Sequence, residues 1–277
     1  MILVVGAGGN VGRYVAAELV RKGAPAKLAS RSPGDRAWPP GARTVAMDMA
    51  DPPSVARALD GVTEVFLVLP VFAPARLAED FVRAVRRSGV RRIVYLSSLS
   101  VEPMHPVAEK LWAKVKREHS ACEAEIGASG IEHTFLRPGP FMSNAVFQWG
   151  AAIRAGEVVR PWYGNHPEAA VHPRDVAAVG VRALVEDGHG GRAYDLTGPE
   201  TLSPAEQVEV IGALLGRPLR FEAAPAAAPG DGEDGEPLVI PEGIMPWSRV
   251  RPTLEGVLGR PGATFGRWAA EHVDLFR

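Results

Sequence analysis

The sequence predicts an α/β fold in which a doubly wound parallel sheet is followed by a small C-terminal lobe. Short apolar runs alternate with helical stretches through the first half of the 277 residues, and a glycine-rich turn joins the first run to the first helix. After residue 140 this rhythm loosens. We therefore expect residues 1–140 to form the sheet domain, and residues 141–277 to contribute to the sheet and to form the lobe.

The expected strands are short runs rich in apolar residues, at 2–5, 26–30, 44–47, 65–69, 92–96, 133–136, 193–196 and 219–222. The expected helices lie at 11–22, 54–59, 76–88, 108–128, 144–154, 173–186, 204–215 and 265–276. Glycines at positions 23, 61, 89 and 130 follow helices and are placed to end them. Residues 223–237 are low in complexity, and we expect a mobile loop there.

The first apolar run leads directly into the sequence Gly-Ala-Gly-Gly-Asn-Val-Gly. Gly6 permits a tight turn, Gly9 lets a pyrophosphate approach the backbone, and Gly12 lets the helix pack against the strand. Asn10 and Val11 stand at the start of the helix and complete the expected anion site. The G-x-x-G-x-x-G spacing between a strand and a helix is typical of short-chain dehydrogenases. It predicts that residues 1–140 form a Rossmann-type dinucleotide-binding domain.

Arg31 and Ser32 follow the second expected strand, where an NAD-selective site places an acidic residue. A guanidinium with a neighbouring hydroxyl suits the 2′-phosphate of NADP(H), and the next acid is Asp35. The alternative is that Arg31 is an ordinary solvated surface residue. We expect the cofactor to be NADP(H).

The ends of the next two strands supply further expected cofactor contacts. Asp48 and Met49 are placed to receive the adenine, although Asp48 could also cap a helix. Asp51 precedes two prolines and is the better helix cap. Leu69 and Pro70 end the fourth strand, where backbone lines a cofactor, although proline is also a routine strand terminator.

Ser97 and Ser98 end the fifth strand, at the carboxyl edge where open parallel sheets bind ligands. One of them could hydrogen-bond the nicotinamide or an acceptor oxygen. A strand-end serine that caps the next segment is equally ordinary.

The tyrosine–lysine pair of short-chain dehydrogenases is missing from this chain. In that pair, Tyr-x-x-x-Lys, the lysine lowers the tyrosine pKa so that the tyrosine can protonate a carbonyl. Tyr14, Tyr95, Tyr163 and Tyr194 are the four tyrosines, and none has a lysine four positions later. This argues against ordinary carbonyl–alcohol chemistry and against nucleotide-sugar epimerisation.

Four motifs resemble the NmrA-like, atypical short-chain dehydrogenase family. They are His-Ser-Ala-Cys-Glu through Leu-Arg-Pro-Gly-Pro-Phe-Met-Ser-Asn (119–144), Val-His-Pro-Arg-Asp-Val-Ala (171–177), Tyr-Asp-Leu-Thr-Gly-Pro-Glu (194–200), and Leu-Gly-Arg-Pro (258–261) with Trp268. The resemblance covers nearly the whole chain except about residues 223–245. That family includes quinone and azo reductases, isoflavone-reductase-like enzymes, and redox sensors that bind the dinucleotide without turning it over. The resemblance therefore implies fold and cofactor class more strongly than activity.

Within this resemblance, His119 occupies the place where the isoflavone-reductase branch carries its catalytic lysine. The helical stripe that includes it is Trp112, Val115, His119, Cys122 and Ile126. His119 should therefore face the core side, and we expect it to contact the nicotinamide, with acid catalysis left open. A core histidine bonded to its surroundings is the alternative. Cys122 is expected to be a small buried side chain rather than a nucleophile.

The resemblance also implies that the loop containing Pro138, Gly139 and Phe141 presents backbone to the carboxamide and an aromatic surface to substrate. The aromatic residues expected to line the substrate cleft are Phe141, Phe147, Trp149, Trp162 and Tyr163. They indicate an apolar or aromatic small-molecule substrate, although such residues also form ordinary lobe cores.

Charge and cysteine content exclude several other classes of protein. A net charge of −1 gives no footprint for nucleic acid or an anionic membrane. Cys122 is the only cysteine, so we expect no disulfide framework and no metal site. The first apolar run is too short for a signal peptide, and no stretch reaches membrane-spanning length, so we expect a cytoplasmic protein. The sequence leaves open whether the protein forms a homodimer.

Two functions follow as expectations. The first is an NADPH-dependent reductase of a quinone, enone or similar conjugated molecule, for which the protein mainly positions the reactants. The second is a catalytically silent NADP(H) sensor that regulates a protein partner. The missing tyrosine–lysine pair favours the sensor, and the aromatic lobe favours the enzyme.

Overall fold

The computed structural model describes all residues except 36, 71–74, 162–163, 224–226 and 229–237. The chain forms two compact units. The sheet unit comprises Met1–Val101, Val115–Arg137 and Pro173–Tyr194, and the second unit comprises Glu102–Lys114, Pro138–His172 and Asp195–Arg277. The units thus interleave along the chain, whereas the sequence suggested one division at residue 140.

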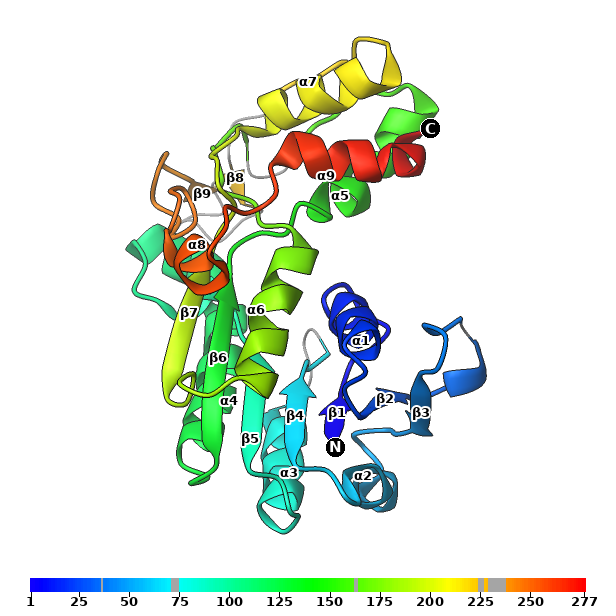
Figure 1. The fold of residues 1–277 in the computed structure, drawn as a ribbon. Coiled ribbons are helices and arrows are strands. Elements are labelled where there is room, and N and C mark those ends of the chain that lie inside the picture. The colour runs from blue at the N-terminus through cyan, green and yellow to red at the C-terminus, as the bar shows by residue number, and fades with distance from the viewer. Residues whose placement is uncertain (36, 71–74, 162–163, 224–226, 229–237) are drawn as a thin grey trace. The chain divides into compact units, whose positions relative to one another are not determined.

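The sheet has the strand order β3-β2-β1-β4-β5-β6-β7 (Figure 1). Its strands are β1 (Ile2–Val4), β2 (Ala26–Ser30), β3 (Arg43–Ala46), β4 (Glu64–Leu67), β5 (Arg92–Leu96), β6 (Glu132–Pro138) and β7 (Arg192–Leu196). The pairings from β3 through to β6 are parallel. The chain order reverses between β1 and β4, which is the switch point where open α/β sheets bind ligands. This confirms the predicted Rossmann-type fold class.

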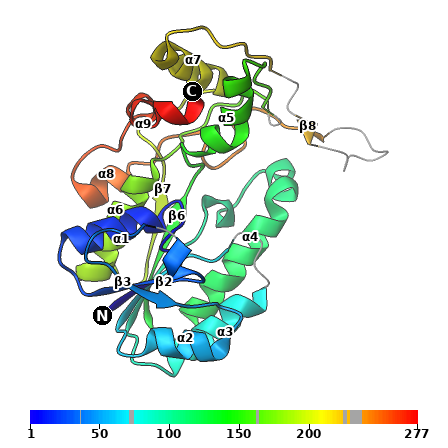
Figure 2. The same ribbon diagram turned by 90° about the vertical axis from the view of Figure 1, so that its right-hand side faces the viewer.

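One face of the sheet packs against α2 (Pro52–Leu59), α3 (Ala75–Arg86) and part of α4 (Pro106–Gly127), as Figure 2 shows. Alternate strand residues, among them Leu3, Val65 and Ile93, point into this core. Burying these side chains on a shared face is the main source of stability for such a layer.

The opposite face packs against α1 (Gly12–Arg21) and α6 (Pro173–Val185), which lie side by side. Gly180 of α6 lies so close to the sheet that an added Cβ would come within 2.7 Å of the Phe66 ring. Glycine at this position therefore sets the approach of the helix to the strand.

The second unit has its own core under helices α5 (Asn144–Ala155), α7 (Pro204–Leu215), α9 (Phe265–Glu271) and the 3₁₀ turn Val273–Phe276. It also contains α8 (Thr253–Leu258) and the short pair β8 (Ala227–Ala228) and β9 (Leu238–Val239). A reciprocal capping box between Ser203 and Glu206 starts α7, and Gly216 ends it at φ +68°.

The structure differs from two of the local expectations. The strand expected at 219–222 does not form, and Phe221 makes only an isolated bridge to Val159. Gly89 is not among the described glycines with positive φ, unlike Gly23, Gly61 and Gly130. The loop expected at 223–237 lies mostly outside the described residues. Among the described helices, none has the length and apolar character needed to span a membrane.

Candidate dinucleotide site and a second pocket

The glycine turn forms a tight cradle at the carboxyl end of β1. Gly6 has φ +75°, in the left-handed region, and its carbonyl oxygen accepts a hydrogen bond from the Gly9 N–H at 2.9 Å. A Cβ on Gly12 would collide with the Gly6 carbonyl oxygen. Gly9 itself is exposed, and among the described residues its Cβ would meet only that same carbonyl oxygen, at 3.1 Å. Gly12 therefore permits the packing, and Gly9 leaves the outer side of the cradle open.

The helix that follows presents its positive end at this cradle. Val11 occupies the N-cap position of α1 and cannot cap it with a side chain, and the first turn carries no acidic residue. Arg13 stands in that turn, with its guanidinium 4.9 Å from the centre of the Tyr14 ring. The helix dipole and the nearby cation together favour a bound phosphate.

Arg31 and Ser32 lie exposed just beyond the carboxyl end of β2. The Ser32 N–H donates to the Ser30 hydroxyl at 3.3 Å, which shapes this turn. Within the described part of the chain, Arg31 forms no ion pair, so its guanidinium is available to a ligand.

Asp48 is exposed after β3, and its Oδ1 accepts a hydrogen bond from the Ala50 N–H at 2.9 Å. The Asp48 side chain thus braces its own turn, whereas the N-cap of α2 is Asp51. Met49 is partly buried against the core of the sheet unit. Asp51 does occupy the N-cap of α2, but its side chain makes no capping bond. Pro53 at the second helical position has no N–H, and the Ser54 N–H at the third donates to the Asp51 backbone carbonyl at 3.0 Å.

Strand β4 ends at Leu67, two residues earlier than expected. Leu69 packs partly against the core of the sheet unit, and Pro70 is exposed. The segment after them, 71–74, lies outside the described residues.

The two serines after β5 are both engaged in hydrogen bonds. The Ser97 hydroxyl is buried and donates to Glu123 Oε1 at 2.6 Å. Arg137 clamps the same carboxylate, from Nε to Oε1 at 2.9 Å and from Nη2 to Oε2 at 2.6 Å. Ser98 accepts a hydrogen bond from the Ser100 hydroxyl at 2.9 Å. Ser97 therefore helps to tie α4 to β6, a role that sequence reasoning missed because Glu123 and Arg137 carry no local signal for pairing.

His119 lies on α4 with its Nδ1 2.8 Å from the hydroxyl of Tyr95, a fully buried residue of β5. Burial lowers the pKa of His119 to about 4, against an opposing effect of Glu123, so the imidazole is neutral at neutral pH. Burial also raises the pKa of the Cys122 thiol to about 12, which makes it a poor nucleophile. Tyr95 is thus a partner for His119 that the sequence did not reveal.

We expect His119→Ala to lower the free energy of unfolding by about 1–3 kcal/mol, because it removes a buried hydrogen bond to the Tyr95 hydroxyl. Thermal unfolding measures this loss. In a Tyr95→Phe background the same substitution should cost less, because the bond is already gone. A fall of about tenfold or more in NADPH affinity would be the further signature of the nicotinamide contact inferred from the resemblance.

The His119 pKa also predicts a dependence of stability on pH. Below about pH 6.5 the unfolded chain takes up a proton, while the folded imidazole stays neutral down to about pH 4. The His119 contribution should therefore make the protein less stable as the pH falls through this window. His119→Ala should flatten that part of the stability profile.

The loop after β6 lies in the second unit. The Gly139 N–H donates to the Leu196 carbonyl at 2.9 Å, and a Cβ on Gly139 would come within 3.0 Å of the Trp247 Cβ. Pro138 is buried, and Phe141 is partly buried and bridges to Val171. Glycine is thus required here for close packing.

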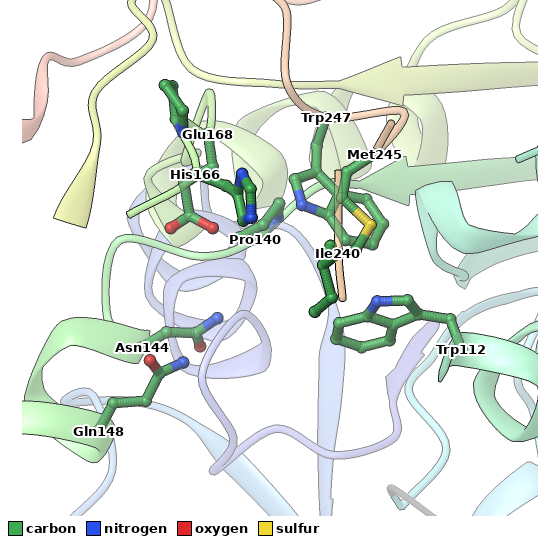
Figure 3. A pocket seen from close by; sticks show the side chains of 10 residues that line it. Trp112, Pro140, Asn144, Gln148, His166, Glu168, Ile240, Met245 and Trp247 are labelled. Carbon is green, nitrogen blue, oxygen red and sulfur yellow. The ribbon is translucent and has the colours of Figure 1, made fainter. Parts of the chain in front are cut away.

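This loop opens into a pocket of about 550 Å³, a volume that includes space open to solvent (Figure 3). The residues lining it are Trp112, Pro140, Asn144, Gln148, His166, Pro167, Glu168, Ile240, Met245 and Trp247. Trp112 and Trp247 meet edge to face, with ring centres 5.2 Å apart. The amides of Asn144 and Gln148 face the pocket from α5. Apolar walls with a few polar groups are typical of a small-molecule site.

Two nitrogens of the pocket residues are buried without a hydrogen-bond partner among the described residues. They are the indole Nε1 of Trp112 and Nε2 of His166. Leaving such atoms unpaired is costly, so a ligand carrying a carbonyl or hydroxyl group would be stabilised by them. Burial also raises the pKa of Glu168 to about 7, against the opposing effect of a hydrogen bond from Gln207.

The aromatic residues predicted to line a cleft have different places. Trp149 belongs to the core of the second unit, whereas Phe147 is 92% exposed. Trp162 and Tyr163 lie outside the described residues. Sequence reasoning missed the pocket residues Trp247 and Glu168, which stand far apart in the chain. The one local signal in the sequence was that Glu168, an acidic residue, directly precedes the apolar run Ala-Ala-Val.

The parallel sheet with its switch point and the glycine cradle at the start of α1 define a dinucleotide-binding α/β protein. The chain belongs to the NAD(P)H-binding family, whose model matches residues 6–187. Membership confirms the resemblance to NmrA-like, atypical short-chain dehydrogenases and the expected NADP(H) cofactor class.

Two curated relatives match essentially the full chain. A (4-alkanoyl-5-oxo-2,5-dihydrofuran-3-yl)methyl phosphate reductase from Streptomyces griseus is 39% identical, covering 100% of this chain and 99% of its own. An NAD(P)H azoreductase from Xenophilus azovorans is 31% identical, with the same coverage of both chains. An NADPH-dependent quinone oxidoreductase from Escherichia coli, solved with NADPH, superposes with a TM-score of 0.75 at 24% identity over 100% of both chains. Both curated relatives are reductases by name, and the azoreductase is named for NAD(P)H. The comparison with the solved structure shows the shared fold.

Proposed function

We propose that this protein is an NADPH-dependent reductase of a small molecule whose double bond is conjugated with a carbonyl. The observation that carries the proposal is the pocket of the second unit, where apolar walls surround two buried nitrogens without partners. An aromatic or conjugated acceptor would fill the apolar walls, and its carbonyl oxygen would accept from the indole N–H of Trp112.

The relatives favour a conjugated carbonyl compound. The Streptomyces griseus reductase acts, by its name, on an unsaturated five-membered lactone, and the Escherichia coli protein is named for quinones. Both kinds of acceptor have a carbon–carbon double bond next to a carbonyl. The higher identity to the lactone reductase leads us to favour enones over quinones as the acceptor class.

We assign the dinucleotide to the glycine cradle of the sheet unit, with a contact set carried over from the sequence. That set is Gly6, Gly9, Asn10, Val11, Gly12, Arg31, Ser32, Asp48, Met49, Leu69, Pro70, Ser97, Ser98, His119, Pro138, Gly139 and Phe141. The cradle supports this assignment because exposed Gly9 leaves its outer side open, and because α1 begins there without an acidic residue. When bound, the reduced nicotinamide supplies the hydride. A neutral His119 could orient it by a hydrogen bond but carries no proton to donate as an imidazolium.

The test is NADPH oxidation followed by absorbance with a panel of enones, unsaturated lactones, quinones and azo dyes. We expect turnover with at least one enone or unsaturated lactone, and weaker turnover with simple ketones, because the tyrosine–lysine pair is absent. Flat traces with every acceptor, together with tight NADPH binding by calorimetry, would favour the alternative of a silent NADP(H) sensor acting on a protein partner.

A further inference from the structure

We propose that Glu168 is the catalytic acid of the pocket in the second unit and delivers the proton that completes reduction of a conjugated carbonyl. This inference rests on the proposed function, since the proton is needed only after hydride has reached the acceptor.

The backbone holds Glu168 rigidly at the pocket wall. Its N–H donates to the Leu202 carbonyl at 3.0 Å, and its carbonyl accepts from the Leu202 N–H at 3.1 Å. The side chain lines the pocket (Figure 3), and Oε1 accepts one long hydrogen bond of 3.4 Å from Gln207 Nε2. The two backbone bonds thus fix the point from which the Glu168 side chain extends, and the bond from Gln207 holds its carboxyl group.

The surroundings of Glu168 favour its protonated form. Burial raises its pKa to about 7. Two cavities adjoin Glu168: the pocket described above, and a second cavity that Glu168 and Glu200 line together. The other titratable groups that line them are His166 in the pocket and Glu200 in the second cavity. No lysine or arginine lines either cavity in the described part of the chain, so no cation there stabilises the carboxylate. A proton donor with a pKa near the working pH is suited to acid catalysis.

The chemistry balances with the groups named. Hydride adds to the β-carbon of the enone, and the electron pair of the double bond moves onto the carbonyl oxygen to form an enolate. The O–H bond of Glu168 then breaks and a C–H bond forms at the α-carbon of the acceptor. The resulting carboxylate takes a proton from water, so that one acceptor, one NADPH and one proton give the reduced acceptor and NADP⁺.

The experiment compares two acceptors with different needs for a proton. The enone 2-cyclohexenone gives a strongly basic enolate that requires an acid. The quinone 1,4-naphthoquinone gives a stable hydroquinone anion that can be protonated later by water. The variants are Glu168→Gln, which keeps the size and the bond to Gln207, and Glu200→Gln as the matched control in the neighbouring cavity.

We expect Glu168→Gln to reduce kcat for 2-cyclohexenone by about 100-fold or more at about pH 6, with a much smaller change for 1,4-naphthoquinone. Wild-type enone turnover should fall as the pH rises through about 7, and this inflection should vanish in the variant. Glu200→Gln should keep both the rates and the inflection. A loss equal for both acceptors would assign Glu168 a structural role and overturn the proposal.

Unchanged enone turnover in Glu168→Gln would also overturn it, as would a wild type that reduces naphthoquinone but no enone. If the wild type oxidises NADPH with none of the acceptors tested, the proposed function is wrong, and the role of Glu168 as its acid is wrong with it. Thermal unfolding checks the variant's fold. Ionising Glu168 in the folded state is disfavoured, so the free energy of unfolding of the wild type should fall as the pH rises from about 4.5 to about 7. Glu168→Gln should become more stable relative to the wild type over the same rise in pH.

Discussion

Gly9→Val is expected to abolish NADPH binding in a protein that still folds. Gly9 is exposed on the open side of the cradle, and a side chain there would occupy the space through which a pyrophosphate reaches the backbone. Charge-assisted hydrogen bonds contribute about 1.5–3 kcal/mol each, so losing two of them weakens affinity by about 10²–10⁴-fold. Calorimetry with NADPH measures the effect, and circular dichroism checks the fold.

Two other glycines make this result specific. Gly127 ends α4 in open space, so Gly127→Val should leave NADPH binding intact. Gly12→Ala should damage folding itself, because its Cβ collides with the Gly6 carbonyl oxygen. An unchanged affinity in Gly9→Val would mean that the dinucleotide does not use this turn.

Arg31→Ala should remove most of a preference for NADPH over NADH that we place at about ten- to a few hundred-fold. One or two charge-assisted bonds to the 2′-phosphate would produce a preference of this size. The variant should bind NADPH more weakly while NADH binding barely changes. The preference of the unmodified protein should also shrink as salt rises, because Arg31 is exposed.

The matched control is Arg43→Ala. Arg43 is also exposed, but it lies opposite Lys27 in the register of β2 and β3, near the amino ends of these strands. Arg31 instead follows the carboxyl end of β2. Calorimetry of both cofactors against the three proteins decides the matter. Equal affinities for NADPH and NADH in the unmodified protein would show Arg31 to be a bystander.

The elements that the sequence predicted well have strong local signals. The strand at 26–30 and the helix at 204–215 match β2 and α7 in both bounds, and the helix is marked by Ser203 and Gly216 at its ends. The strand expected at 219–222 was wrong because Leu219 and Phe221 pack against the core of the second unit instead of pairing along a neighbouring strand. An apolar alternation predicts burial but not the partner.

The same limit applies to the sites. The glycine cradle was predictable because every residue of it lies within one short motif. The pocket was not, because Trp112, Glu168 and Trp247 come from three distant segments. The bond from Tyr95 to His119 was equally hidden, since it joins β5 to α4. Contacts of this kind depend on tertiary packing, and no periodic pattern in the sequence predicts them.

The interleaved course of the chain has a consequence for how the protein is made. Helix α6 and most of β7 belong to the sheet unit but are synthesised after the first part of the second unit. Until they emerge from the ribosome, the face of β4 that receives Gly180 of α6 stays uncovered at Phe66. Contacts between such distant segments slow folding and leave apolar surface open to aggregation. Fragments that stop near residue 140 should therefore be insoluble or dependent on chaperones, and expression or domain-swap experiments need the whole chain.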